Sequence, residues 1–151
     1  MLRALGIKFL DENGEDVGNG AQALGRIAQI ETKKKNPLLA ESFFKVACDV
    51  TNPLCGENGA TFVFGPQKGV TEEQKVPIDG AMKHYAAITE QTLACDCVNA
   101  KGSGAAGGMG FAFLSYLQAE LIPGIDLILD TVGIEQELKG SGGCICPQDS
   151  L

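Results

Sequence analysis

Residues 46–69 read VACDVTNPLCGENGATFVFGPQKG, and this segment decides the fold. Nearly continuous apolar character at its start predicts a strand over 43–50 in a buried position. Asp49 and Asn52 follow at the end of that strand, before a glycine-containing loop and the GPQKG sequence at 65–69. A carboxylate, an amide, a lysine and free backbone amides are thereby gathered in one short segment. Chemistry on a phosphate or a carboxylate needs groups of this kind.

Strands and helices are predicted to alternate on both sides of this segment. Thr71 and Gln74 have the spacing of a capping box, and apolar or small residues follow at helical spacing as far as Leu93. Pro77 either kinks this helix or begins a second one. The other predicted elements are short strands at 7–10 and 28–32, a helical turn within 19–27, a glycine-rich loop at 102–110 and an apolar helix at 111–121. This alternation predicts an α/β fold.

Length and charge limit the classes of function. The chain has 151 residues, which is one domain's worth, and a net charge of −7. The negative charge argues against nucleic acid as a partner, because binding to nucleic acid requires a basic footprint. Charge or glycine interrupts each apolar run, so no membrane span is predicted, and the start, MLRALGIKFLDENGED, does not resemble a secretory signal. A cytoplasmic protein is therefore expected.

The cysteines allow more than one interpretation. There are six of them, at positions 48, 55, 95, 97, 144 and 146. An even count is compatible with disulfides, but nothing else in the sequence indicates secretion. The two Cys-x-Cys pairs could supply four thiolates to zinc, although zinc sites usually space their ligand pairs by two to four residues. We expect free thiols and keep a small zinc module as an alternative.

Gly102, Gly104 and Gly107 spell G-x-G-x-x-G. In a dinucleotide-binding fold these glycines follow a strand and open a helix, and an acidic residue about 20 positions later holds a ribose. A helix is predicted to follow, but 96–101 is not a convincing strand and no strand ending in an acid lies at the right distance. Two further interpretations stay open: an anion site made of backbone amides at a helix N-terminus, and close packing of the helix on a neighbour.

Lys68 lies between Gly65 and Gly69, just before the capped helix. A cation near a helix N-terminus is unfavourable unless it has an anionic partner, which a phosphate or carboxylate ligand would supply. The alternative is a solvated lysine in a turn. Asp49, at a strand end, can ligate Mg²⁺, accept a hydroxyl proton or cap the following turn.

With these residues placed, the chain resembles glycerate kinases of the bacterial type. The matching words are ALGIKFLDENG, ACDVTNPLCGENGATFVFGPQKGVT, MKHYA and GSGAAGGMGFAFLSYLQAELIPGIDLILDTVGIEQEL, in this order over about residues 1–139. The resemblance implies an α/β enzyme of two domains with its active site in the cleft between them. It also implies transfer of phosphate from ATP to a hydroxyl of D-glycerate, usually giving 2-phosphoglycerate.

The resemblance further implies roles for individual residues. Asp49 would bind Mg²⁺ or orient the glycerate hydroxyl, and Lys68 would neutralise a phosphate or the glycerate carboxylate. Gln67 and Asn52 would supply side-chain amides that orient the substrate, and backbone amides at 104–108 would hold an anion. The expected substrate- and phosphate-binding residues are Asn52, Gln67, Gly69, Gly104, Gly107 and Gly108. Phosphoryl transfer depends mainly on such positioning and charge neutralisation.

Departures from the family pattern also carry expectations. Residues 1–140 are identified as the central portion of a glycerate kinase, forming one side of the cleft, and residues 141–151 as a non-homologous tail. Family members are far longer, and motifs on both sides are missing here, so we expect little or no kinase activity from this chain alone. Uncovered apolar surface predicts self-association into a homo-oligomer. A non-catalytic α/β remnant that binds an anion, or nothing at all, is the alternative.

Overall fold

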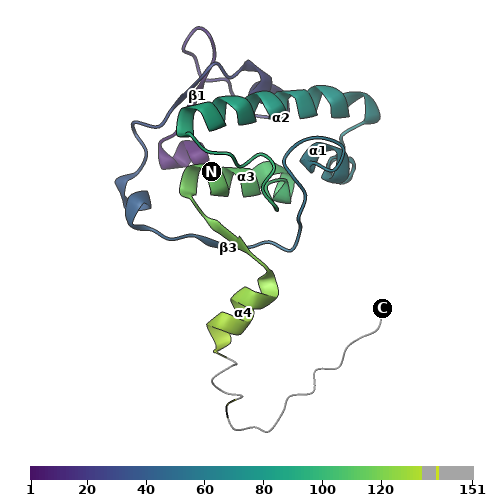
Figure 1. Ribbon diagram of the computed structural model, residues 1–151. Coiled ribbons are helices and arrows are strands. Elements are labelled where there is room, and N and C mark those ends of the chain that lie inside the picture. Colours follow the sequence, from purple (N-terminus) through teal and green to yellow (C-terminus); the bar gives the residue numbers. More distant parts are fainter. Residues whose placement is uncertain (134–138, 140–151) are drawn as a thin grey trace.

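A computed structural model of the chain describes residues 1–133 and 139 (Figure 1). It contains both helices and short strands, which confirms the predicted α/β class. The elements are η1 (Leu2–Leu5), β1 (Lys8–Leu10), η2 (Ala21–Arg26), β2 (Gln29–Glu31), η3 (Pro37–Glu41), β3 (Lys45–Ala47), α1 (Ala60–Phe64), η4 (Pro66–Lys68), α2 (Glu72–Leu93), α3 (Ala105–Leu117), β4 (Glu120–Ile122) and α4 (Gly124–Val132). The η elements are 3-10 turns. The predicted tail at 141–151 lies outside the described residues.

The core is built where α2 and α3 meet the first strand. Aromatic rings interlock there edge to face: Phe9 lies 6.0 Å from Tyr85 and 6.2 Å from Tyr116, and Tyr85 lies 5.5 Å from Phe111, between ring centroids. Such edge-to-face pairs add to the stabilisation that comes from burying the rings. Inside this core the hydroxyls of Thr89 and Tyr116 share a hydrogen bond of 2.8 Å, so both polar atoms are satisfied.

Helix α2 begins as its sequence predicts. The Gln74 side chain accepts a hydrogen bond of 3.1 Å from the backbone N–H of Thr71, which is half of the reciprocal capping-box pattern. Pro77 lies inside a single helix that continues to Leu93, so of the two alternatives at Pro77, a second helix beginning there is wrong. The buried face of the helix includes Asp79 together with apolar side chains.

The strands form two small sheets. β1 and β2 pair antiparallel, with Phe9 opposite Ile30, and β3 and β4 pair parallel, with Val46 opposite Leu121. The apolar helix predicted at 111–121 is therefore wrong at its C-terminal end. Helix α3 stops at Leu117, because Gln118 adopts a left-handed conformation (φ 51°) and turns the chain into β4.

The prediction of a buried strand over 43–50 is also wrong. The strand is three residues long, its outer residues are exposed, and the Phe43 side chain before it is 101% exposed. A continuous apolar run is typical of a strand covered on both faces, but β3 has only β4 beside it among the described residues. The side chains of β3 therefore remain exposed or half-buried.

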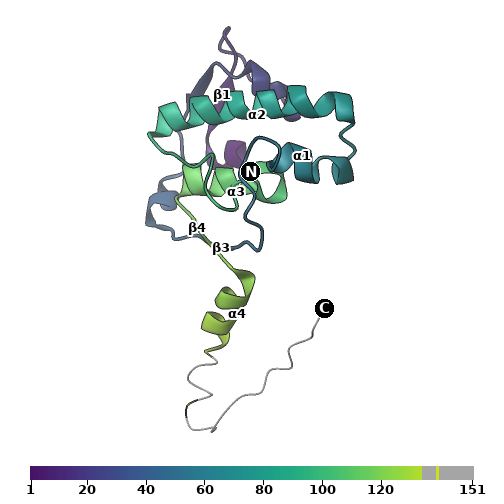
Figure 2. The same ribbon diagram turned by 45° about the vertical axis from the view of Figure 1, so that its right-hand side comes forward.

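Helix α4 projects from the end of the β3–β4 pair, away from the core, as both views show (Figures 1 and 2). None of its residues is buried, and its large apolar side chains are exposed. These are Ile125, Ile128, Leu129 and Val132. An amphipathic helix without a covering layer is an unpartnered surface.

Candidate functional site

The loop after β3 is joined to the glycine-rich segment by backbone hydrogen bonds. The Asn52 side-chain amide donates to the carbonyl of Asn58 at 2.9 Å, which closes the loop. The Asn52 carbonyl accepts from the N–H of Gly104 at 3.0 Å. Two of the predicted site residues are thus in direct contact, although they are far apart in the sequence.

The glycine-rich segment forms a left-handed turn at the start of α3. Ala106, Gly107 and Gly108 have φ values of 51°, 77° and 97°. Residues other than glycine rarely adopt this left-handed backbone conformation. At Gly104 a Cβ would lie 2.3 Å from the carbonyl oxygen of Pro53, so close approach excludes a larger residue there. Of the two open interpretations of these glycines, close packing therefore has support, and it applies at Gly104. The N–H groups of Gly104, Gly107 and Gly108 donate to backbone carbonyl oxygens, so the anion site made of backbone amides stays a prediction.

Lys68 reaches this turn from a separate element. It lies on η4, which ends at Gly69 with φ 84°, and a Cβ at Gly107 would lie 2.8 Å from the lysine Nζ. No described acidic residue is within ion-pair distance of Lys68. The ammonium group therefore faces a glycine turn and is not neutralised by a carboxylate, which leaves it available to an anion. Gln67 is exposed beside it.

Asp49 lies in a different contact group. Its Oδ1 accepts a hydrogen bond of 2.8 Å from the N–H of Gly124, the first residue of α4. This bond joins Asp49 to a helix 75 residues away in the sequence and not to the turn that follows it, so the role of Asp49 stays a prediction. Among the described residues, no hydrogen bond or ion pair connects Asp49 with Lys68 or with the Gly107 turn.

The described residues do not form a metal site made of protein ligands alone. No group of three or more His, Cys, Asp or Glu side chains among them could hold a metal ion. A single carboxylate is nevertheless compatible with Mg²⁺ bound next to a nucleotide, because this ion commonly takes one or two carboxylates and completes its shell with phosphate oxygens and water. Asp49 has one oxygen that bonds to none of the described residues, so it fits this limited role.

Asp79 on α2 holds the loop after β3 through a hydrogen bond to Gly56, and the sequence alone did not predict this role. Its side chain is 3% exposed; Oδ1 accepts from the N–H of Gly56 at 2.9 Å and Oδ2 lies 2.9 Å from Lys83 Nζ. Burial, together with the nearby Asp79 carboxylate, raises the pKa of the Cys55 thiol to about 11. The sequence signal that could have revealed Asp79 is a single acidic residue among the apolar positions of the predicted helix.

Two further residues position the turn that leads into α3. Glu90 Oε1 accepts the N–H groups of Cys97 and Val98, both at 2.8 Å. The buried Ser103 hydroxyl lies within 2.9 Å of the carbonyl oxygens of Val98 and Ala100. These bonds fix the path of the chain immediately before Gly104.

The dinucleotide and zinc alternatives find no support in this geometry. Residues 94–101 contain turns and no strand, so the strand that a nicotinamide-binding loop requires before Gly102 is missing and that alternative is wrong. Cys48, Cys55, Cys95 and Cys97 are free thiols, and the second Cys-x-Cys pair lies outside the described residues. None of the described helices is both long and apolar enough to cross a bilayer.

Comparison with known proteins identifies what this arrangement is similar to. The model of the glycerate kinase family matches residues 1–146. A glycerate 2-kinase of Escherichia coli strain K12 is 41% identical over 138 residues, which are 91% of this chain and 36% of that protein. A glycerate kinase of Bacillus subtilis strain 168 is 43% identical over 135 residues, 89% of this chain and 35% of that protein.

A solved structure agrees with the fold. The crystal structure of a glycerate kinase 2 from Salmonella typhimurium LT2 superposes with a TM-score of 0.90 and 39% sequence identity. The match covers 93% of this chain and 37% of that one. The chain thus spans little more than a third of the length of these relatives.

Proposed function

This chain belongs to the glycerate kinase family, and on that premise we propose that it carries one wall of a site that transfers phosphate from ATP to D-glycerate. The proposed product is 2-phosphoglycerate. The observation that carries the proposal is the meeting of Lys68 with the left-handed turn at Gly107, where a cation without a described carboxylate partner faces glycine backbone. A transferring phosphate is the kind of anion that such a pair would hold.

Each group has a simple task in this proposal. Lys68 neutralises negative charge on a phosphate or on the glycerate carboxylate. Gly107 has no side chain between its backbone and the Lys68 ammonium, so an anion can approach both closely, and Gly104 and Gly108 hold the turn in this conformation on either side. A preorganised cation and dipoles stabilise the charge of the transition state without having to reorganise during the reaction.

The remaining predicted residues complete the wall. Asn52 holds the glycine segment in place through its carbonyl, so its proposed role is to position the turn. Gln67, exposed next to Lys68, supplies an amide to the substrate, and Gly69 ends the η4 turn that presents both. Asp49 orients the glycerate hydroxyl or holds Mg²⁺, and the ion when bound supplies positive charge to the phosphates.

The chain alone is expected to bind ligand but to turn over little or none, because the residues described here furnish only one wall. A coupled assay of ADP formation with ATP and D-glycerate on the purified chain tests this expectation. Robust turnover would contradict the one-wall proposal. The proposal also includes a cytoplasmic location and self-association through uncovered apolar surface.

Binding is tested by the melting temperature. A ligand that binds only the native state raises it, so ATP should stabilise the chain. Lys68→Gln should remove most of that rise, whereas Lys33→Gln, a matched change at another exposed lysine, should leave it intact. Equal rises in the two variants would refute the role of Lys68.

The same contacts favour one second candidate, a non-catalytic module that binds an anion. It predicts the Lys68-dependent stabilisation but no turnover under any condition. Mixing this chain with a separately produced remainder of a glycerate kinase separates the two candidates. Activity that appears on mixing and is lost with Lys68→Gln would exclude the non-catalytic module.

A further inference from the structure

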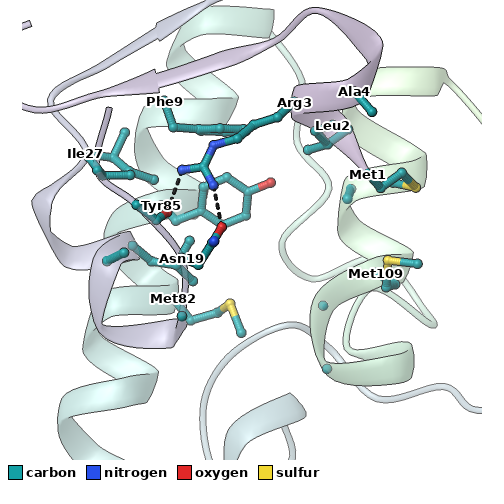
Figure 3. A pocket seen from close by; sticks show the side chains of 18 residues that line it. Met1, Leu2, Arg3, Ala4, Phe9, Asn19, Ile27, Met82, Tyr85 and Met109 are labelled. Carbon is teal, nitrogen blue, oxygen red and sulfur yellow. Dashed lines mark hydrogen bonds between the residues drawn. The ribbon is translucent and has the colours of Figure 1, made fainter. Parts of the chain in front are cut away.

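A cavity of about 570 Å³ opens next to the glycine turn. Its walls come from the N-terminal residues, η2, the middle of α2 and the first turn of α3 (Figure 3). Figure 3 shows Phe9, Tyr85 and Met82 on one side of the hollow and Met1 with Met109 on the other. Small-molecule sites are typically cavities of about 300–1,000 Å³, so this one has the size of a ligand site.

The chemical character of the cavity does not suit glycerate. Its floor consists of apolar and aromatic side chains, among which Phe9, Met82 and Tyr85 are each less than a tenth exposed. D-glycerate has a carboxylate and two hydroxyls on three carbons and no apolar part, so an apolar floor would leave those groups unsatisfied. A flat heterocycle, which is apolar on its faces and polar at its edge, matches such a floor better.

Polar groups at the rim match the edge of a heterocycle. Arg3 donates to Asn19 Oδ1 at 2.7 Å and is also held by Asp16 at 2.9 Å. Because the Asn19 oxygen is taken by Arg3, its amide N–H groups remain to donate. Ring nitrogens of a nucleobase accept such hydrogen bonds.

The cavity is continuous with the proposed anion site. Gly107, Gly108 and Met109 all line it. A Cβ at Gly108 would lie 3.6 Å or less from the sulfur and methyl of Met82 on the cavity side, whereas Gly107 faces Lys68 Nζ. Two adjacent glycines of the turn thus lie between the apolar cavity, which Met82 lines, and the Lys68 ammonium. A ligand with a flat base at one end and phosphates at the other spans this arrangement.

We infer that this cavity binds the base of a nucleotide, with the phosphates lying over the glycine turn toward Lys68. The inference rests on the proposed function and adds to it which substrate occupies which part of the wall: the nucleotide takes the cavity beside η1 and α2, and glycerate does not.

Calorimetric titration of the chain with ATP, adenosine and inorganic triphosphate tests the inference. Ala4→Trp fills the mouth of the cavity from an exposed position in η1, and Met109→Trp, at a side chain 43% exposed, fills it from helix α3. Ala87→Trp, exposed on α2 and away from the cavity, is the matched control. Lys68→Gln, with Lys33→Gln as its control, probes the phosphate end.

The expected pattern separates the two ends of the nucleotide. The two cavity variants should weaken ATP and adenosine by about tenfold or more and leave triphosphate within about twofold, whereas Lys68→Gln should weaken ATP and triphosphate only. ATP binding that both cavity variants leave unchanged would overturn the inference while the Lys68 site stands. Failure of triphosphate to bind in a Lys68-dependent manner would overturn the proposed function itself. Failure of all three probes to bind the unmodified chain would overturn both.

Discussion

Removing the Asp79 carboxylate tests whether the buried acid on α2 holds the loop that carries the candidate site. Asp79→Ala deletes the acceptor of the Gly56 N–H and leaves that amide without its partner. A hydrogen bond to a charged group contributes about 1.5–3 kcal/mol. The variant should therefore lose about 2–3 kcal/mol of unfolding free energy.

Asp79→Asn separates the hydrogen bond from the charge. The amide oxygen can still accept from Gly56, and neutral hydrogen bonds are roughly half as strong as charge-assisted ones, so the expected loss is only about 1 kcal/mol. Lys83, whose side chain is 61% exposed, returns to solvent in both variants. Asp96→Ala, at an exposed aspartate on the turn after α2, should stay within about 0.5 kcal/mol of the unmodified chain.

Urea unfolding followed by circular dichroism measures these differences, at several protein concentrations so that self-association is recognised. Equal losses for Asp79→Asn and Asp79→Ala would refute the assignment of the stabilisation to the amide acceptor. An Asp79→Ala variant as stable as Asp96→Ala would refute the contact altogether.

Three further perturbations follow from the same structure. Gly107→Val places a branched side chain at φ 77° and against Lys68; it should weaken triphosphate binding by about tenfold or more in a calorimetric titration, and unchanged binding would contradict the turn as an anion site. Phe111→Ala empties a fully buried position and should cost about 3–5 kcal/mol in urea unfolding, so a loss below about 1 kcal/mol would mean that the core packs differently. Cys55 should react with iodoacetamide at pH 8 about 100-fold more slowly than a thiol of ordinary pKa, because its raised pKa of about 11 leaves less thiolate; the rate, followed by mass spectrometry, should rise with pH up to that value, and a fast, pH-independent reaction would exclude the buried thiol.

Local signals in the sequence predicted local structure well. The capping box before α2 and the strands at 7–10 and 28–32 depend on residues close in sequence, and the structure contains all three. The end of α3 could not be predicted in the same way. The run from 111 to 121 is uniformly apolar, and what divides it is the parallel pairing of β4 with β3, a contact between distant segments.

The candidate site shows the same division. Lys68, the glycine segment and Asn52 were each expected in the site from the family resemblance, but their contacts with one another depend on how η4, α3 and the loop pack. Asp79 and the cavity were missed, because a single acid in an apolar stripe and a group of dispersed apolar residues have no short motif. Such features become visible only when the elements are placed in space.

The parallel pair β3–β4 has a consequence for the order of folding. The Asp49–Gly124 hydrogen bond beside it joins residues 75 positions apart, so a long loop must be closed before the pair gains any stabilisation. Helices α2 and α3 follow each other in the sequence and can pack without such closure, and the β3–β4 pair has little buried area to compensate. We therefore expect the β3–β4 pair to form after the α2–α3 core during folding and to open before it during unfolding. Backbone amides at Val46 and Leu121 should exchange hydrogen for deuterium through local opening, whereas those at Thr89 and Phe111 should exchange only through global unfolding.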